Sequence, residues 1–171
     1  MYDKFKEKIL MKSGQIAPEI EKLSDDIYHN PELSYEEYKA YKWHTELLEK
    51  YGFEIEHKLC DIDTAFLASY DSGKPGLTIA YLAEYDALPG IGHGCGHNML
   101  GATSTAAGIL LKEVLEDLGG KVYVYGTPAE ETDGGKNILA DKGKFDDVNI
   151  AMMSHPETGY RKSGTSLAMK A

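Results

Sequence analysis

The sequence predicts an α/β fold, in which a layered sheet carries helices on both faces. From about residue 77 onward, short runs rich in β-branched and aromatic residues alternate with helical patterns, which is typical of strands joined by helices. The composition, 42% hydrophobic and 27% charged, is that of an ordinary globular chain that can form a core. A length of 171 residues allows one domain, or one domain and a fragment of another.

A first helix is predicted by apolar residues at helical spacing: Ile16, Ile20, Leu23 and Ile27. Ser13 or Pro18 is expected to open it, and it should end near His29. A second helix should follow over about 35–51, because Ser34 and Glu37 form a capping-box pattern and Gly52 can end a helix.

The remaining elements follow from runs of strand-forming residues and from further helical periodicity. Five strands are expected, over 53–58, 64–70, 77–83, 122–126 and 148–153. Two more helices should occupy 98–118 and 134–142. The longer of these is expected to bury one stripe of residues, namely Met99, Ala102, Ala106, Ile109, Leu110 and Leu115.

The charge of the chain argues against nucleic-acid binding. The balance of 18 basic and 28 acidic residues gives a net charge of −10, and Arg161 is the single arginine. The longest nearly uninterrupted apolar stretch, 106–111, is too short for a membrane span, and no secretory signal is recognisable at the N-terminus. We therefore expect a cytoplasmic protein in which Cys60 and Cys95 are not a disulfide scaffold.

A glycine-rich loop over 90–98 carries three possible metal ligands, His93, Cys95 and His97. Alternation in an extended loop would point Cys95 and His97 the same way, and thiolate with imidazole suits zinc or a similar metal. Two alternatives remain open. The loop is a plain glycine turn with solvated histidines, or Cys95 is a nucleophile with His97 as its base and with a pKa lowered by the following helix N-terminus.

Acidic residues and a histidine stand at the ends of three predicted strands. Glu130 and Glu131 follow the strand over 122–126, and such a pair suits a metal-activated water beside a general base. Taken alone, the pair is equally a solvated acidic loop at a helix N-terminus. His155 follows the last strand, and Asp86 follows the third, where it could orient a metal-bound imidazole. Together these strand ends form a convergent set.

Four motifs give the chain a family resemblance. They are Ala83-Glu84-Tyr85-Asp86-Ala87-Leu88-Pro89, Gly92-His93-Gly94-Cys95-Gly96-His97-Asn98, Gly126-Thr127-Pro128-Ala129-Glu130-Glu131 and His155-Pro156, and the segment from His29 to Ser34 also fits. In this order they resemble the M20 family of metallopeptidases and amidohydrolases. The resemblance is strongest to the branch that holds the aminobenzoyl-glutamate hydrolases and the aminoacylase-1-like protein 2 dipeptidases.

The resemblance implies a role for each strand-end residue. Metal ligands would be Cys95, His97, Glu131 and His155, with Glu130 as the catalytic general base and Asp86 beside the site. The family usually carries two divalent metal ions, zinc or manganese. Glu84 departs from the wider superfamily, in which histidine commonly stands two residues before the aspartate, and Asn98 replaces the aspartate of many amidohydrolases.

The function implied is hydrolysis of an amide bond in a small N-acyl amino acid or dipeptide by a metal-activated water. The family pattern also implies that residues 1–171 form the N-terminal portion of a zinc-peptidase-like catalytic domain, with the lid and dimerisation domain and the C-terminal catalytic half not present. Such a chain is expected to self-associate and to have little activity alone. The alternatives are a non-catalytic metal-binding fragment and a cysteine hydrolase that uses Cys95.

Overall fold

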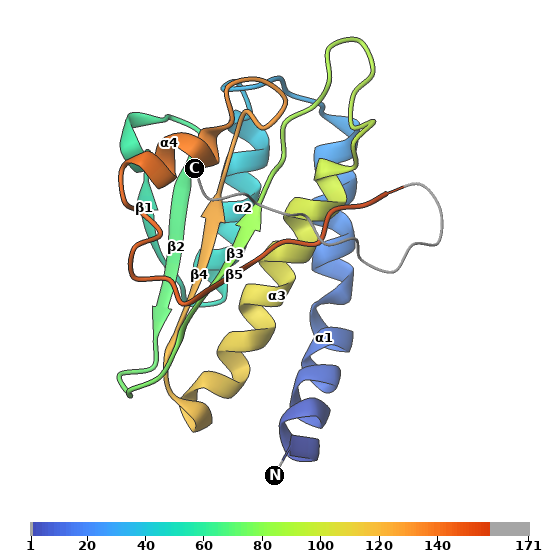
Figure 1. The fold of residues 1–171 in the computed structure, drawn as a ribbon. Coiled ribbons are helices and arrows are strands. Elements are labelled where there is room, and N and C mark those ends of the chain that lie inside the picture. The colour runs from blue at the N-terminus through green and yellow to red at the C-terminus, as the bar shows by residue number, and fades with distance from the viewer. Residues whose placement is uncertain (1, 158–171) are drawn as a thin grey trace.

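The computed structural model describes residues 2–157 and has a single mixed sheet with helices on both faces (Figure 1). The strand order in the sheet is β1-β2-β4-β3-β5. The strands are β1 (Glu54–His57), β2 (Phe66–Asp71), β3 (Thr78–Ala83), β4 (Lys121–Gly126) and β5 (Ile150–Met152). The predicted α/β class and all five predicted strands are confirmed within one or two residues at most ends.

Strand direction brings three carboxyl ends to the same edge of the sheet. β4 and β5 both run parallel to β3, on either side of it, whereas β2 pairs antiparallel with β1 and β4. Parallel strands need helical crossovers, and here α3 (His97–Leu118) connects β3 to β4. The segments that follow β3, β4 and β5 therefore emerge side by side, as ligand sites in α/β sheets require.

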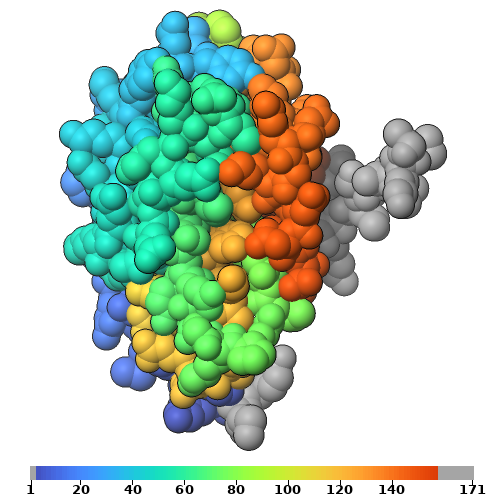
Figure 2. All heavy atoms as spheres, turned by 90° about the vertical axis from the view of Figure 1, so that its left-hand side faces the viewer, coloured from blue at the N-terminus to red at the C-terminus, as the bar shows by residue number. Residues whose placement is uncertain are grey.

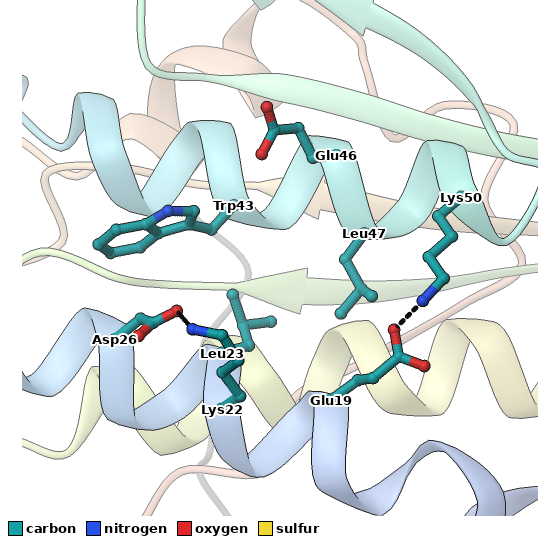
Figure 3. A pocket seen from close by; sticks show the side chains of 8 residues that line it. All are labelled: Glu19, Lys22, Leu23, Asp26, Trp43, Glu46, Leu47 and Lys50. Carbon is teal, nitrogen blue, oxygen red and sulfur yellow. Dashed lines mark hydrogen bonds and ion pairs between the residues drawn. The ribbon is translucent and has the colours of Figure 1, made fainter.

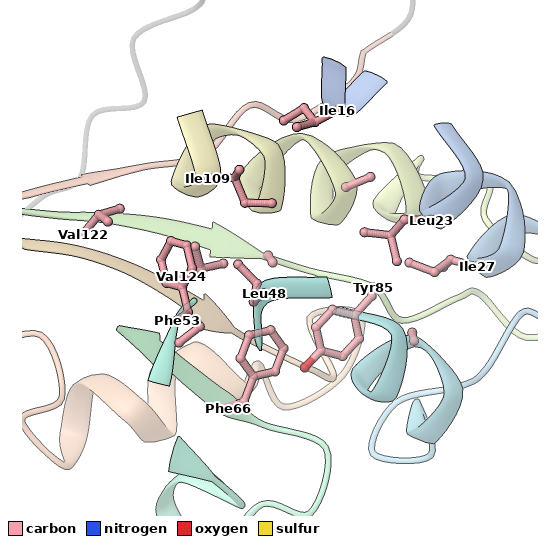
Figure 4. Close-up of a cluster of buried hydrophobic side chains, with 14 of the residues drawn as sticks. Ile16, Leu23, Ile27, Leu48, Phe53, Phe66, Tyr85, Ile109, Val122 and Val124 are labelled. Atoms are coloured by element: carbon pink, nitrogen blue, oxygen red, sulfur yellow. The ribbon is translucent and has the colours of Figure 1, made fainter. Parts of the chain in front are cut away.

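Two hydrophobic clusters lie on opposite faces of the sheet. Along β4, Val122 and Val124 pack toward α1 (Tyr2–His29), α2 (Tyr38–Lys50) and α3, with other apolar residues that Figure 4 labels. Tyr123 and Tyr125 point to the other face, where Leu139 of α4 (Gly135–Asp141) and a 3-10 turn (Leu59–Asp61) cover the sheet. This alternation follows the two-residue period of a strand.

The smaller cluster is closed by the segment between α4 and β5. In Figure 2 these orange-red residues lie against the teal and green residues of the first two strands. Lys144 Nζ lies 2.9 Å from Glu56 Oε1 of β1, and Tyr125 Oη donates to the Lys144 carbonyl at 2.5 Å. None of the helices within residues 2–157 has the length and apolar character needed to cross a membrane.

The first helix differs from the prediction in where it starts. α1 begins at Tyr2 rather than at Ser13 or Pro18, and Pro18 lies inside it. Tertiary packing explains this, because α1 lies along α3 over its length (Figure 1). Lys8 pairs with Asp117 at 3.8 Å and Lys12 with Glu113 at 3.1 Å. These contacts outweigh the hydrogen bond that an interior proline removes.

The predicted capping box before the second helix is wrong. α2 begins at Tyr38 after the N-cap residue Glu37, and no side chain caps it. Ser34 Oγ instead donates to Asp86 at 3.1 Å, and the Glu37 carboxylate is fully buried. Met99 also departs from its predicted place in the buried stripe, since its side chain is 50% exposed.

Candidate metal centre

Two buried acids extend from the end of β3 into the edge of the sheet. Glu84 and Asp86 are almost completely buried, and Tyr85 between them points into the core. Gly101 of α3 permits this arrangement, because a Cβ there would lie 2.6 Å from the Glu84 carbonyl oxygen. A side chain at Gly101 would push α3 away from the strand end.

His97 is the first residue of α3 and lies at the centre of the cluster. Its Nδ1 lies 3.0 Å from the Asp86 carbonyl oxygen and 3.1 Å from Asp86 Oδ1. Its Nε2 lies 3.3 Å from Glu84 Oε2, 3.8 Å from Glu130 Oε2 and 3.9 Å from Glu131 Oε1. Asp86 thus fixes the ring so that Nε2 faces the remaining carboxylates.

Asp86 and His97 shift each other's pKa. Burial by itself would raise the pKa of Asp86, but hydrogen bonds from His97 and from the Glu131 amide outweigh it and hold that pKa below its ordinary value. Burial would likewise lower the pKa of His97, yet the hydrogen bond to Asp86 and its charge outweigh burial and raise that pKa. Each group stabilises the charged form of the other.

His155 reaches the cluster from the segment after β5. Its ring centroid lies 5.4 Å from that of His97, at an interplanar angle of 88°. Gly96 allows this approach, since a Cβ there would lie 3.0 Å from Pro156 Cγ. One ligand atom each of Glu84, His97 and His155 lie within 4.8 Å of one another, and the same holds for His97, Glu130 and Glu131.

Cys95 lies beside Glu131 rather than in an extended loop. Gly96 has a φ of +79° and His97 already belongs to α3, so the alternation argument for Cys95 and His97 is wrong. The hydrogen bond to Glu131, followed by burial and by the negative charges of Glu131, Glu130 and Asp86, raises the pKa of Cys95 to about 11. The predicted lowering by the helix N-terminus is therefore wrong, and the metal-free thiol is a poor nucleophile.

Sequence reasoning missed the parts played by Glu84 and Lys136. Lys136 Nζ of α4 forms an ion pair with Glu84 Oε1, which leaves Oε2 facing His97. An acidic residue directly after a buried strand was the available signal for Glu84. No local pattern identifies Lys136, because it meets Glu84 only through the packing of α4.

His93, the third possible ligand of the loop, belongs to neither cluster of ligand atoms in residues 2–157. Its side chain is buried beside Tyr28 and Pro31, where burial and then the charge of His97 lower its pKa. Its position therefore favours a neutral, structural histidine.

The cluster fits a divalent cation. His97 Nε2 and Glu84 Oε2 are buried and have no hydrogen-bond partner among the described residues, an arrangement that costs free energy unless a ligand satisfies both atoms. Imidazole, carboxylate and thiol donors are the set that zinc and similar metals prefer.

A second hollow lies in the groove between α1 and α2 (Figure 3). Leu23, Trp43 and Leu47 form its apolar floor. The charged residues at its rim neutralise one another, since Lys22 pairs with Asp26 at 2.5 Å and Lys50 pairs with Glu19. This groove has none of the unsatisfied buried atoms that mark the cluster at the sheet edge.

Known proteins resemble the chain in both sequence and fold. The chain is 40% identical over 154 residues to a polypeptide of the p-aminobenzoyl-glutamate hydrolase of Escherichia coli (strain K12), a match covering 79% of this chain and 32% of that protein. A solved Bacillus subtilis structure, a dinuclear metal-binding peptidase from the M20 family, superposes with a TM-score of 0.71 at 27% identity. This chain belongs to the M20 family.

The structural match covers 81% of the chain and 43% of the Bacillus subtilis M20 peptidase. The Xaa-Arg dipeptidase of Mus musculus is 38% identical over 159 residues, which are 83% of this chain and 36% of that enzyme. No family model matches the chain. The chain spans about a third of the length of the curated relatives it matches.

Proposed function

We propose that this M20 protein is a metal-dependent hydrolase of an amide bond in a small N-acyl amino acid or dipeptide. The observation that carries the proposal is the buried His97 Nε2, which has no hydrogen-bond partner among residues 2–157 yet faces three carboxylates within 3.9 Å. A relative named p-aminobenzoyl-glutamate hydrolase and a relative named Xaa-Arg dipeptidase support this substrate class.

The proposed ligands are Cys95, His97, Glu131 and His155, with one or two zinc or manganese ions. When bound, the metal supplies an activated water at neutral pH and polarises the amide carbonyl. Asp86 contributes by holding the His97 ring through Nδ1. Because Glu131 raises the pKa of Cys95 to about 11, the thiol must lose a proton when it becomes a ligand, so metal affinity rises with pH.

Glu130 is the proposed general base. Its side chain is about one-third exposed and its Oε2 lies 3.8 Å from His97 Nε2, so it reaches both the ligand cluster and solvent. In this position it can take a proton from the attacking water and then return it to the leaving amine.

Two alternatives make different predictions. A non-catalytic metal-binding fragment would hold metal without turnover, which agrees with a chain that spans about a third of its relatives. We therefore propose that residues 1–171 are the N-terminal portion of an M20 catalytic domain and have little activity alone. A cysteine hydrolase would need a thiolate at Cys95, which the neighbouring Glu131 disfavours.

We further propose a cytoplasmic location and self-association. Cys60 and Cys95 are both free thiols, as is usual in a reducing compartment. Ile150, Met152 and Met153 are each more than 40% exposed at the edge of the sheet, and an apolar edge strand favours association with another copy.

The test combines metal analysis with amide hydrolysis by the complete protein. Metal content is measured after purification, and hydrolysis of N-acyl amino acids and dipeptides is assayed with added zinc or manganese. Glu130→Gln should keep the metal and lose turnover by about a thousandfold or more, because the amide cannot transfer the proton. Glu131→Gln should instead weaken metal binding.

Cys95→Ser separates the cysteine alternative from the metal mechanism. Under the proposal, excess metal restores part of its activity, because serine is a weaker ligand at an otherwise intact site. The proposal fails if neither glutamine variant changes kcat, or if activity persists after complete removal of metal.

A further inference from the structure

Glu37 is a buried carboxylate that the proposed mechanism does not use. It stands just before α2, and its side chain is fully buried. Its Oε2 accepts a hydrogen bond from Thr64 Oγ1 at 2.8 Å, and its Oε1 accepts one from the Ala129 backbone N–H at 2.9 Å. A buried carboxylate is costly unless it is well bonded, so these two partners account for its presence.

The Ala129 contact lies next to the proposed catalytic residues. Ala129 has a φ of +60°, a left-handed conformation that alanine rarely adopts. It is fully buried and directly precedes Glu130. Its carbonyl oxygen accepts the Gly134 N–H at 2.8 Å, which closes the turn from the other side. Such a strained residue persists only where its surroundings hold it.

A second buried carboxylate holds the other side of the same turn. Asp86 Oδ2 accepts the Glu131 backbone N–H at 3.0 Å. The amides on either side of Glu130, those of Ala129 and Glu131, therefore both end on buried carboxylates that come from distant parts of the chain. Hydrogen bonds to charged acceptors are the stronger kind, so this pair restrains the backbone from which both glutamates project.

We propose that Glu37 is a positioning residue that holds the 129–131 turn and thereby sets the directions of Glu130 and Glu131. It acts through the Ala129 amide and touches neither metal nor substrate. The catalytic meaning of this role rests on the proposed function, whereas the restraint on the turn does not. Glu37 is reached from the opposite end of the sheet edge, through the loop that contains Thr64.

The experiment measures amide hydrogen exchange of the 171-residue chain at pH 7.5, free of metal. The readout is the exchange rate of the amides of 129–132 divided by that of the β4 amides of Val122 and Val124. This ratio removes the effect of any global loss of stability. Glu37→Leu should raise the ratio about tenfold or more, because it removes the charged acceptor of the Ala129 N–H.

Two further variants separate positioning from general packing. Thr64→Val removes the other hydrogen bond of the same carboxylate, so it should lower the melting temperature while leaving the exchange ratio within about threefold of wild type. Glu37→Gln keeps one oxygen acceptor for the Ala129 amide and should fall between wild type and Glu37→Leu. Should Glu37→Leu not fold, Glu37→Asp decides, because its carboxylate is one methylene too short to keep both partners.

Zinc affinity then connects the turn to the site. Competition of the chain with a chromogenic chelator should show about tenfold weaker zinc binding for Glu37→Leu, or for Glu37→Asp, than for Thr64→Val, because Glu131 is displaced. An unchanged exchange ratio in the Glu37 variant, an equal rise in Thr64→Val, or a loosened turn with undiminished zinc affinity would each overturn the proposal. If the wild-type chain binds no zinc, the proposed function fails, while the exchange ratio still tests Glu37.

Discussion

β4 and β5 flank the same strand and both lead to the candidate metal centre, yet their surroundings differ. β4 pairs with β2 and β3 over six residues each and has four buried residues. β5 pairs with β3 over three residues, and all three are exposed. The turn after β4 is held by Glu37 and Asp86. For His155, the hydrogen bond found within residues 2–157 goes to the adjacent Pro156 carbonyl.

This difference indicates that the two sides contribute to the site in different ways. On the β4 side, buried charges and strained backbone fix the ligands before metal arrives, so binding there costs little reorganisation. On the β5 side, His155 has a direction set mainly by its own neighbours and by the ring of His97. We therefore expect perturbations on the β4 side to have the larger effects.

The largest expected effect follows from removing Lys136. Lys136→Met leaves the buried Glu84 charge without its partner, which should lower the free energy of unfolding of the metal-free chain by about 3 kcal/mol. Chemical denaturation in the presence of a chelator measures it. The double variant with Glu84→Gln should recover most of the loss. If Lys136→Met alone were as stable as wild type, the ion pair would have no structural weight.

Zinc affinity provides the next comparison, between His97 and His155. His97→Ala should weaken zinc binding about a hundredfold or more, because His97 belongs to both groups of possible ligands. His155→Ala should weaken it about tenfold. Isothermal titration of both variants against zinc checks the order. Equal losses would mean that the exposed side of the site is as well organised as the buried side.

Core substitutions in the two strands should differ in the same direction. Val124→Ala in β4 removes a fully buried side chain and should cost about 2 kcal/mol of unfolding free energy, including the cavity. Met152→Ala in β5, where the side chain is 41% exposed, should cost about 0.5 kcal/mol or less. Urea unfolding of the two variants measures both values, and a β5 cost equal to that of β4 would contradict the comparison.

The smallest effect per step concerns pH and His44, which lies beneath the β3 end against Tyr85 at 5.2 Å. Burial lowers the pKa of His44 to about 3. The folded chain keeps it neutral while the unfolded chain takes up a proton below pH 6.5. Its contribution to stability is therefore complete above pH 6.5 and falls as pH drops toward 3, by at most about 1.4 kcal/mol per pH unit.

Denaturation between pH 7 and 4 measures this slope. His44→Gln should flatten it, whereas His29→Gln, at an exposed position, should leave it unchanged. A slope that persists in His44→Gln would assign the pH dependence to other groups.

Much of the fold was predictable because it depends on local patterns. Alternating apolar runs predicted all five strands, and the spacing of apolar residues predicted α2, α3 and α4. The strand ends also identified Asp86, Glu130, Glu131 and His155 as neighbours, because parallel strands must deliver their carboxyl ends to one edge. Each of these inferences needs only a few consecutive residues and the geometry of a sheet.

The remaining features depend on contacts between residues far apart in the chain. α1 runs through Pro18 because α3 lies beside it, and Glu37 leaves its predicted capping role because Thr64 and Ala129 surround its carboxylate. Glu84 meets Lys136 across 52 positions. The sequence by itself determined which side chains stand at the strand ends. Only tertiary structure decided which buried charges meet, because the cost of burying a charge is set by the partners that packing brings to it.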